Sequence, residues 1–280
     1  MLSLVFGSFG LIIGSFLNVI ILRRGEKSLS GRSACPSCGK QIRWYDLIPV
    51  LSWFILKGSC RDCGHPISLQ YPLVEAGTAA VFVGISLASI SLPFKIFALP
   101  IAALLVAIAV YDFRTTIIPD PWVFLLGILT FISALVGALL TDTSVLLALL
   151  AGPIAALPLF ALWLVSRGRW MGLGDSKLTL SMGWLLGIEG GLTALFLSFV
   201  VGAIISLPLM YFSSNSFARL KYSLLGSPHN AINGPSPSTR GFTMKSEIPF
   251  GPFLIASCFL VWFAQMYGFN LTILSVVYGI

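Results

Sequence analysis

The sequence is poor in charged residues. Asp, Glu, Lys and Arg make up only 10% of the 280 residues, whereas a soluble domain carries roughly 25%. Hydrophobic residues make up 57% of the chain, and its mean hydropathy is +0.95. A larger apolar core cannot explain so few charged residues in a chain of this length. The composition therefore excludes a soluble domain and predicts a protein that crosses a membrane several times.

Histidines and common catalytic motifs are also scarce. The chain has two histidines, His65 and His229, and contains no Gly-x-Ser-x-Gly, no His-Glu-x-x-His and no phosphate-binding loop. Serine, metal-dependent and nucleotide-driven chemistries therefore lack their usual residues. No internal repeat is obvious, so an inverted-repeat transporter has no support from the sequence.

The N-terminus lacks the basic segment of a cleavable signal. Residues 1–22 form a long apolar run, and Arg23 and Arg24 follow it. This pattern predicts an uncleaved first transmembrane helix with its N-terminus outside. The fold class that we expect is an all-α polytopic membrane protein with about eight transmembrane helices, and the eight apolar runs are 2–22, 72–92, 94–111, 121–140, 144–166, 178–189, 191–212 and 250–268.

The basic residues support this topology. With the N-terminus outside, every Lys and Arg except Lys95 falls in a segment predicted to face the cytoplasm. This distribution follows the membrane topology, so the net charge of +7 does not indicate nucleic acid. The segments predicted to face the cytoplasm are 23–71, 112–120, 167–177 and 213–249. The last of them is rich in Ser, Asn, Pro and Gly, which predicts a flexible loop.

Four cysteines form two Cys-x-x-Cys-Gly pairs in the segment 23–71. They are Cys35, Cys38, Cys60 and Cys63. Four thiolates spaced in this way predict a closed, structural Zn²⁺ site in a zinc-ribbon-like insert. The alternative, two disulfides or free thiols, is disfavoured because a cytosolic segment is reducing. Cys258 lies alone in an apolar run and is interpreted as a buried small side chain.

Four acidic residues lie near the predicted inner membrane surface, where an unpaired charge is costly. They are Glu75, Asp112, Asp120 and Asp175. Asp120 lies between two prolines at a helix start, where capping explains it without chemistry. For Asp112 the alternative to a catalytic role is an ion pair with Arg114, and for Asp175 it is capping of the following helix.

Asp112 and Asp175 together suggest acid–base chemistry. Asp112 is expected at a helix C-terminus, whose partial negative charge favours the protonated carboxyl, and Asp175 at a helix N-terminus, which favours the carboxylate. One group could then activate water as the base while the other polarises a peptide carbonyl as the acid. We expect Asp175 as the base and Asp112 as the acid of an aspartyl protease.

Several further motifs occur in order along nearly the whole chain. They are Gly14-Ser15-Phe16-Leu17-Asn18-Val19, the paired Cys-x-x-Cys insert, Trp44-Tyr45-Asp46 with Ile48-Pro49, Tyr71-Pro72-Leu73-Val74-Glu75, Asp112 with Pro119-Asp120, Gly172-Leu173-Gly174-Asp175, and Pro249-Phe250-Gly251-Pro252. Together they resemble the type IV prepilin peptidases (prepilin leader peptidase/N-methyltransferases), which are membrane aspartyl proteases of the Gly-x-Gly-Asp type.

This resemblance implies that Asp112 and Asp175 are the catalytic residues. It implies three domains: 1–22 as the first transmembrane helix, 23–71 as a cytoplasmic four-cysteine zinc insert associated with methylation, and 72–280 as a protease core of about seven helices containing the loop 213–249. The implied location is the bacterial inner membrane, with the active site facing the cytoplasm.

The resemblance also implies the substrates and the reaction. The partners would be precursors of type IV pilins or type II secretion pseudopilins, cut after a Gly that ends a short basic leader. The new N-terminal residue, usually Phe, would then be methylated with S-adenosylmethionine. No residues are assigned to this methyl donor; Glu75 and Asn18 either help to shape its site or simply pack at the membrane.

Two rival functions remain at this point. One is a transporter in which Asp112 and Asp175 relay protons or bind a cation, and the other is a membrane scaffold that holds a partner through the zinc insert. The identity of the pilin substrates and the oligomeric state, including a homo-oligomer, are left open by the sequence.

Overall fold

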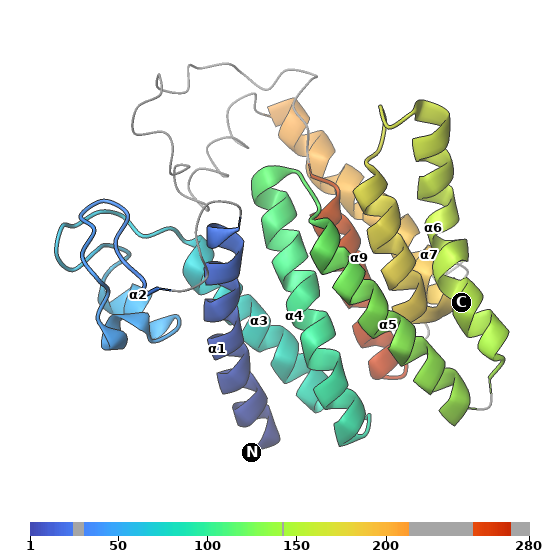
Figure 1. The fold of residues 1–280 in the computed structure, drawn as a ribbon, viewed down its shortest axis with the longest axis horizontal. Coiled ribbons are helices and arrows are strands. Elements are labelled where there is room, and N and C mark those ends of the chain that lie inside the picture. The colour runs from blue at the N-terminus through green and yellow to red at the C-terminus, as the bar shows by residue number, and fades with distance from the viewer. Residues whose placement is uncertain (25–30, 142, 213–248, 270–280) are drawn as a thin grey trace. The chain divides into compact units, whose positions relative to one another are not determined.

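Every long element in the described part of the chain is a helix (Figure 1). The structure is a computed structural model, and it describes residues 1–24, 31–141, 143–212 and 249–269. Two isolated bridges, Ala34 with Gln41 and Ser59 with Pro66, are the β pairing within these residues. The all-α class is therefore confirmed. The predicted loop 213–249 lies almost entirely outside the described residues.

The chain divides into two units, and residues 1–86 belong to the first. The elements of this part are α1 (Leu2–Arg23), the 3₁₀ helix η1 (Trp44–Leu47), α2 (Leu51–Ile55) and α3 (Gln70–Leu87). Helices α1 and α3 pack closely, because a Cβ atom built on Gly14 would lie only 2.6 Å from Cα of Glu75. The segment between these two helices carries all four clustered cysteines and the short helices η1 and α2.

The second unit contains residues 87–206 and α9. Its helices are α4 (Leu92–Thr115), α5 (Asp120–Leu140), α6 (Val145–Ser166), α7 (Leu173–Phe212, of which residues to Ser206 belong here) and α9 (Gly251–Met266). Within it, α4 packs against both α5 and α9, and α5 also packs against α6.

Helix α7 is a hairpin of two arms rather than one long rod. Gly187 has φ 77° and ψ 178°, which breaks the helical backbone. A Cβ atom on Gly191 would lie 3.0 Å from Cα of Gly183, although eight residues of continuous helix would separate these positions by about 12 Å. The chain therefore reverses at Gly187. The arms 173–186 and 188–212 correspond to the predicted spans 178–189 and 191–212.

Five helices are long and apolar enough to cross a membrane within the described residues: α1, α4, α5, α6 and α7 up to Ser206. Helix α9 is shorter, with 16 residues, and α3 has 18. With α7 counted as two arms, the eight predicted spans each correspond to a helix or an arm. The protein is a multi-pass membrane protein. Its orientation in the membrane stays a prediction.

Candidate active site and candidate metal centre

Asp112 lies in the last turn of α4 and is held by the start of α9. Its side chain is buried, with 3% of the residue exposed. One carboxylate oxygen, Oδ2, accepts a hydrogen bond of 3.1 Å from the backbone N–H of Gly251, the first residue of α9. The contact joins residues 139 positions apart in the sequence. It fixes one oxygen of the carboxylate by a backbone donor.

The approach of α9 to Asp112 requires glycine at position 251. A Cβ atom there would lie 2.6 Å from Oδ2 of Asp112, 3.1 Å from its Cγ and 3.4 Å from Cδ1 of Ile118. Any other residue would displace the carboxylate or the helix start. Gly251 belongs to a motif visible in the sequence, but its contact with Asp112 has no local sequence signal, because the two residues are 139 positions apart.

Asp175 lies in the first turn of α7. Its carboxylate reaches back toward the residue before the helix, because a Cβ atom built on Gly172 would lie 3.5 Å from Oδ2 of Asp175. The helix begins at Leu173, so the carboxylate lies beside the partial positive charge at the N-terminus of α7. This is the position that the capping alternative predicts.

The structure brings Asp112 and Asp175 together in the second unit. Their carboxylates are close enough for their charges to interact. Ile118, between α4 and α5, packs against both neighbouring helix starts, because Cβ atoms on Gly174 and Gly251 would lie 3.0 Å and 3.4 Å from its side chain. Two carboxylates that share a site repel each other when both are ionised. Such a pair is suited to hold one proton between its members.

Asp112 faces two helix ends of opposite polarity. The partial negative charge at the C-terminus of α4 acts on it, as the sequence predicted, but so does the partial positive charge at the N-terminus of α9. Helix ends alone therefore do not decide which carboxylate acts as the acid. The assignment of Asp175 as the base and Asp112 as the acid stays a prediction.

Asp120 is placed differently from these two. It is the first residue of α5, but Pro119 occupies the N-cap position and makes no side-chain capping bond. Its carboxylate instead forms an ion pair of 2.7 Å with Lys177, and its side chain is 70% exposed. The prediction that Asp120 caps the helix is wrong, because the carboxylate turns away from the helix start toward this lysine.

The four cysteines of the insert converge in the first unit. The Sγ atoms of Cys35, Cys38, Cys60 and Cys63 all lie within 4.8 Å of one another. The Sγ atoms of Cys35 and Cys63 are 3.7 Å apart, and all four cysteines are free thiols. A tetrahedral zinc ion with bonds of about 2.3 Å would place its sulfur ligands about 3.8 Å apart. The cluster therefore has the ligand type and spacing to hold a metal ion.

The two halves of the cluster share one backbone geometry. In each half the backbone carbonyl of the first cysteine accepts a 2.9 Å hydrogen bond from the backbone N–H of the glycine that follows the second cysteine. These glycines, Gly39 and Gly64, both have φ of +70°, a conformation that glycine adopts without strain. Each half is also closed by one of the two isolated β-bridges. Two equivalent turns thus present their thiols to one point.

Ion pairs link the halves of the insert. Arg61, between the second pair of cysteines, donates two hydrogen bonds of 3.1 and 2.7 Å to the carboxylate of Asp46 in η1. This bidentate contact holds the pKa of Asp46 below its usual value. Lys40, after the first cysteine pair, forms a 3.1 Å ion pair with Asp62. Both contacts support the folded shape around the thiols.

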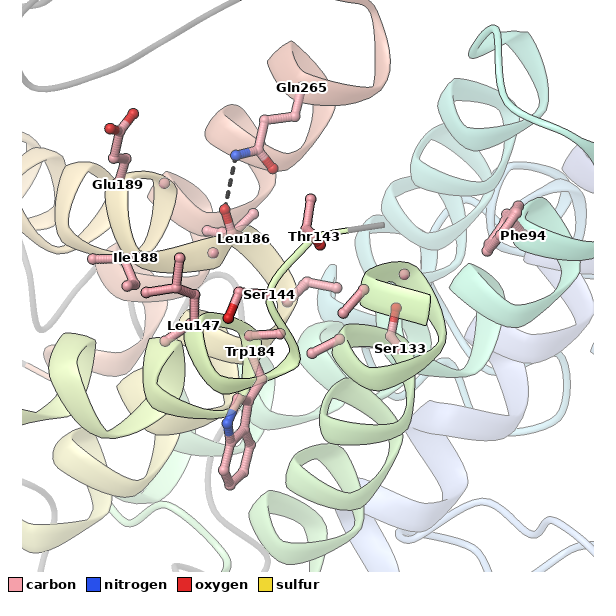
Figure 2. Close-up of a pocket in the computed structure, with 18 residues that line it drawn as sticks. Phe94, Ser133, Thr143, Ser144, Leu147, Trp184, Leu186, Ile188, Glu189 and Gln265 are labelled. Atoms are coloured by element: carbon pink, nitrogen blue, oxygen red, sulfur yellow. Dashed lines mark hydrogen bonds between the residues drawn. The ribbon is translucent and has the colours of Figure 1, made fainter. Parts of the chain in front are cut away.

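A cavity of about 610 Å³ lies at the far end of the second unit from the aspartates. Its lining includes Phe94 at the start of α4, Trp184 and the turn of the α7 hairpin, and Gln265 of α9, which donates a 2.9 Å hydrogen bond to the carbonyl of Leu186 (Figure 2). Phe94 and Asp112 are separated by about 27 Å along α4. The cavity is therefore distinct from the aspartate pair.

Two family models match the chain. Residues 8–89 match the bacterial peptidase A24 N-terminal domain, and residues 99–207 match the type IV leader peptidase family. The first match contains all four clustered cysteines, and the second contains Asp112 and Asp175. No solved structure matches the chain.

The chain is also similar to curated proteins. The prepilin leader peptidase/N-methyltransferase of Aeromonas hydrophila is 30% identical over an alignment of 299 positions. The alignment covers 96% of this chain and 92% of that protein. The protein of the same name from Vibrio cholerae is 34% identical over 66% of this chain and 78% of its own length. The type 4 prepilin-like proteins leader peptide-processing enzyme of Escherichia coli is 38% identical over 64% and 74%. Because the Aeromonas hydrophila relative is matched over 92% of its length and two family models match residues 8–89 and 99–207, this chain belongs to the type IV leader peptidase family.

Proposed function

We propose that the protein is an aspartic endopeptidase that removes the leader peptide from prepilins or pseudopilins and then methylates the new N-terminus. The observation that carries the peptidase activity is the pair of carboxylates, Asp112 and Asp175, each lying against the start of a helix, α9 for Asp112 and α7 for Asp175. The relatives' names support both activities.

The carboxylate pair can perform peptide hydrolysis without a metal. One carboxylate takes a proton from a water molecule, whose oxygen attacks the carbonyl carbon of the scissile peptide. The other carboxyl group gives its proton to the carbonyl oxygen, which forms a tetrahedral gem-diol. The first group then gives the proton taken from water to the peptide nitrogen, while the second takes back a hydroxyl proton, so the C–N bond breaks and leaves a carboxylic acid and a free amine. We assign the base to Asp175 and the acid to Asp112, following the sequence.

The substrate class follows from the family. We expect a precursor with a short basic leader that ends in Gly, followed by an apolar stretch that begins with Phe. Cleavage after the Gly would take place on the cytoplasmic face of the bacterial inner membrane. The distribution of Lys and Arg supports this orientation, because it puts both aspartates at the inner surface.

The four-cysteine insert is proposed as a structural zinc site that supports methylation. Four thiolates leave no open coordination position for a substrate, so the ion would hold the insert folded rather than react. The new amine would take a methyl group from the sulfonium of S-adenosylmethionine. The remainder of the donor would leave as a neutral thioether, and the methylated amine would release a proton. We assign no residue to the binding of this donor.

Co-expression with a precursor tests the proposed function. Membranes that contain the wild-type protein and a type IV prepilin should yield a shortened product whose N-terminal residue carries one methyl group. Mass spectrometry of the product measures both changes. An uncut precursor would contradict the peptidase, and a cut product with a free, unmethylated terminus would contradict the second activity alone.

Gly251→Ala should slow cleavage because the added Cβ displaces the Asp112 carboxylate. A misplacement of this kind costs about 10²-fold in rate. We expect the loss in kcat with little change in KM, since Gly251 contacts the carboxylate rather than a proposed substrate-binding group. Initial rates over a range of precursor concentrations separate the two constants.

Gly137→Ala is the matched control for Gly251→Ala. A Cβ atom on Gly137 would meet nothing within 4 Å, and the residue lies in α5, away from the aspartates. This variant should cleave at the wild-type rate. Equal rates for Gly251→Ala and wild type would show that the N-terminus of α9 does not position Asp112.

A further inference from the structure

Val50, at the start of α2, has a backbone conformation that valine rarely adopts. Its φ is 62° and its ψ is −52°, and the N–H of Leu51 donates a 2.6 Å hydrogen bond to the carbonyl of Pro49. This is a three-residue γ-turn with positive φ at a β-branched residue, which is a strained arrangement. Strain of this kind persists only where neighbouring contacts impose it, and it often marks a functional constraint.

Glu75 supplies the contact that holds this turn. Its Oε2 atom accepts a hydrogen bond of 2.6 Å from the backbone N–H of Val50. Glu75 belongs to α3 and is only 6% exposed. Glu75 also lies where α3 packs against α1, because a Cβ atom on Gly14 would lie only 2.6 Å from its Cα atom. The buried carboxylate therefore binds the insert through Val50 at the place where α1 and α3 meet.

A second buried contact lies nearby and strengthens the junction of α1 and α3. The side chain of Asn18 donates a 3.2 Å hydrogen bond to the carbonyl of Tyr71 and accepts one of 3.1 Å from Gln70. Asn18 is 0% exposed and Gln70 is 3% exposed. Buried polar groups that are fully bonded fix a single arrangement of the elements that carry them.

The contacts that shape the cysteine cluster do not include the Glu75–Val50 bond. The thiols, the two cysteine turns and the Arg61–Asp46 and Lys40–Asp62 pairs all lie within residues 35–66. The Glu75–Val50 bond instead fixes the insert relative to α1 and α3. Its effect is on the position of the insert, which a strained turn defines more narrowly than a flexible linker would.

We infer that Glu75 is a positioning residue for the methyl-transfer reaction, which it serves by holding Val50 in the strained turn and so fixing the insert on α1 and α3. The inference rests on the proposed methyltransferase activity. It assigns Glu75 no contact with the methyl donor and no part in peptide cleavage.

Glu75→Leu in the full-length protein tests this role, because leucine fills the buried space but cannot accept the Val50 N–H. We expect the rate of methylation of the cleaved pilin to fall about 10–100-fold, because a small displacement of reacting groups has an effect of this size. Leader removal and zinc content should stay close to wild type. Glu75→Gln keeps an acceptor oxygen and should retain most of the methylation. The readouts are the mass of the product's N-terminus, its rate of formation and the zinc bound per protein.

Val50→Pro provides a second variant that leaves α3 unchanged. Proline has no N–H and cannot adopt a positive φ, so methylation should again fall while cleavage remains. Val50→Gly is the matched control, since glycine adopts this φ without strain and keeps the N–H donor; it should methylate like wild type.

Three results would overturn the inference. Normal methylation by Glu75→Leu would contradict the positioning role of Glu75. It would not contradict the proposed methyltransferase activity, which methylation by the wild type tests separately. Loss of zinc and cleavage along with methylation would show that Glu75 is merely structural. An unmethylated product from the wild type would overturn the methyltransferase activity itself, and this inference with it.

Discussion

Asp112→Asn and Asp175→Asn should each abolish leader cleavage, with rates at least about 10³-fold below wild type. Asparagine keeps the shape and most hydrogen bonds of the side chain but neither gives nor takes the proton. General acid–base catalysis contributes about 10²–10⁴-fold, and residues that act as a unit show losses that are not additive. The double variant should therefore cleave no more slowly than either single one. Single-turnover rates with purified enzyme and precursor measure this.

Asp120→Asn is the matched control for these two variants. It makes the same chemical change at the start of α5, where the carboxylate is exposed and pairs with Lys177. An exposed ion pair contributes about 1 kcal/mol or less, so this variant should cleave normally. Complete processing by Asp112→Asn or Asp175→Asn would refute the two-aspartate mechanism. Loss of cleavage in Asp120→Asn would show that the three acids had been assigned wrongly.

Replacing Cys35 and Cys38 together by serine should release the metal and abolish methylation. Structural zinc sites contribute about 10–16 kcal/mol of binding free energy that is also folding free energy. Two of four ligands cannot maintain a tetrahedral thiolate site, so the insert should unfold. Cleavage should fall much less, because both aspartates belong to the second unit. Zinc content, methylation and cleavage, all measured on one preparation, check the three parts of this expectation.

Cys258→Ala is the control for loss of a thiol. Cys258 is 0% exposed in α9 and takes no part in the cysteine cluster. The variant should keep its zinc and both activities. Full zinc content and full methylation in the Cys35→Ser, Cys38→Ser variant would contradict a structural role for the metal. Equal loss of both activities would contradict the separate placement of the two reactions.

Much of the fold follows from local properties of the sequence. Apolar runs predict helices because a bilayer leaves no water to satisfy backbone groups, and all eight runs correspond to a helix or an arm of α7. The cysteine pairs predict their own cluster because both the ligand spacing and the following glycines are local. The ends of the helices were predicted less accurately. The first arm of α7 begins at residue 173 rather than 178, because its first turn contains polar residues and an apolar run does not include them.

The contacts that shape the candidate sites could not be predicted in the same way. Gly251 lies 139 residues from Asp112, and Val50 lies 25 residues from Glu75. Neither contact produces a periodic pattern, and positive φ at a valine has no sequence signal. The capping prediction for Asp120 was wrong for a related reason. A proline next to an acid marks the helix start, but a lysine 57 residues away decides where the carboxylate points.

The hairpin in α7 has a consequence for the depth at which its turn lies in the membrane. Its first arm, 173–186, spans about 21 Å, while the hydrocarbon core of a bilayer is about 30 Å thick. The cavity of about 610 Å³ borders the turn of the hairpin, so neighbouring helices do not fill all the remaining space. Residues 173–186 are all buried or half-buried, so neighbouring helices rather than lipid surround this arm. The turn at Gly187 is therefore expected below the membrane surface, where water in the cavity could satisfy the backbone groups that the break in the helix leaves free.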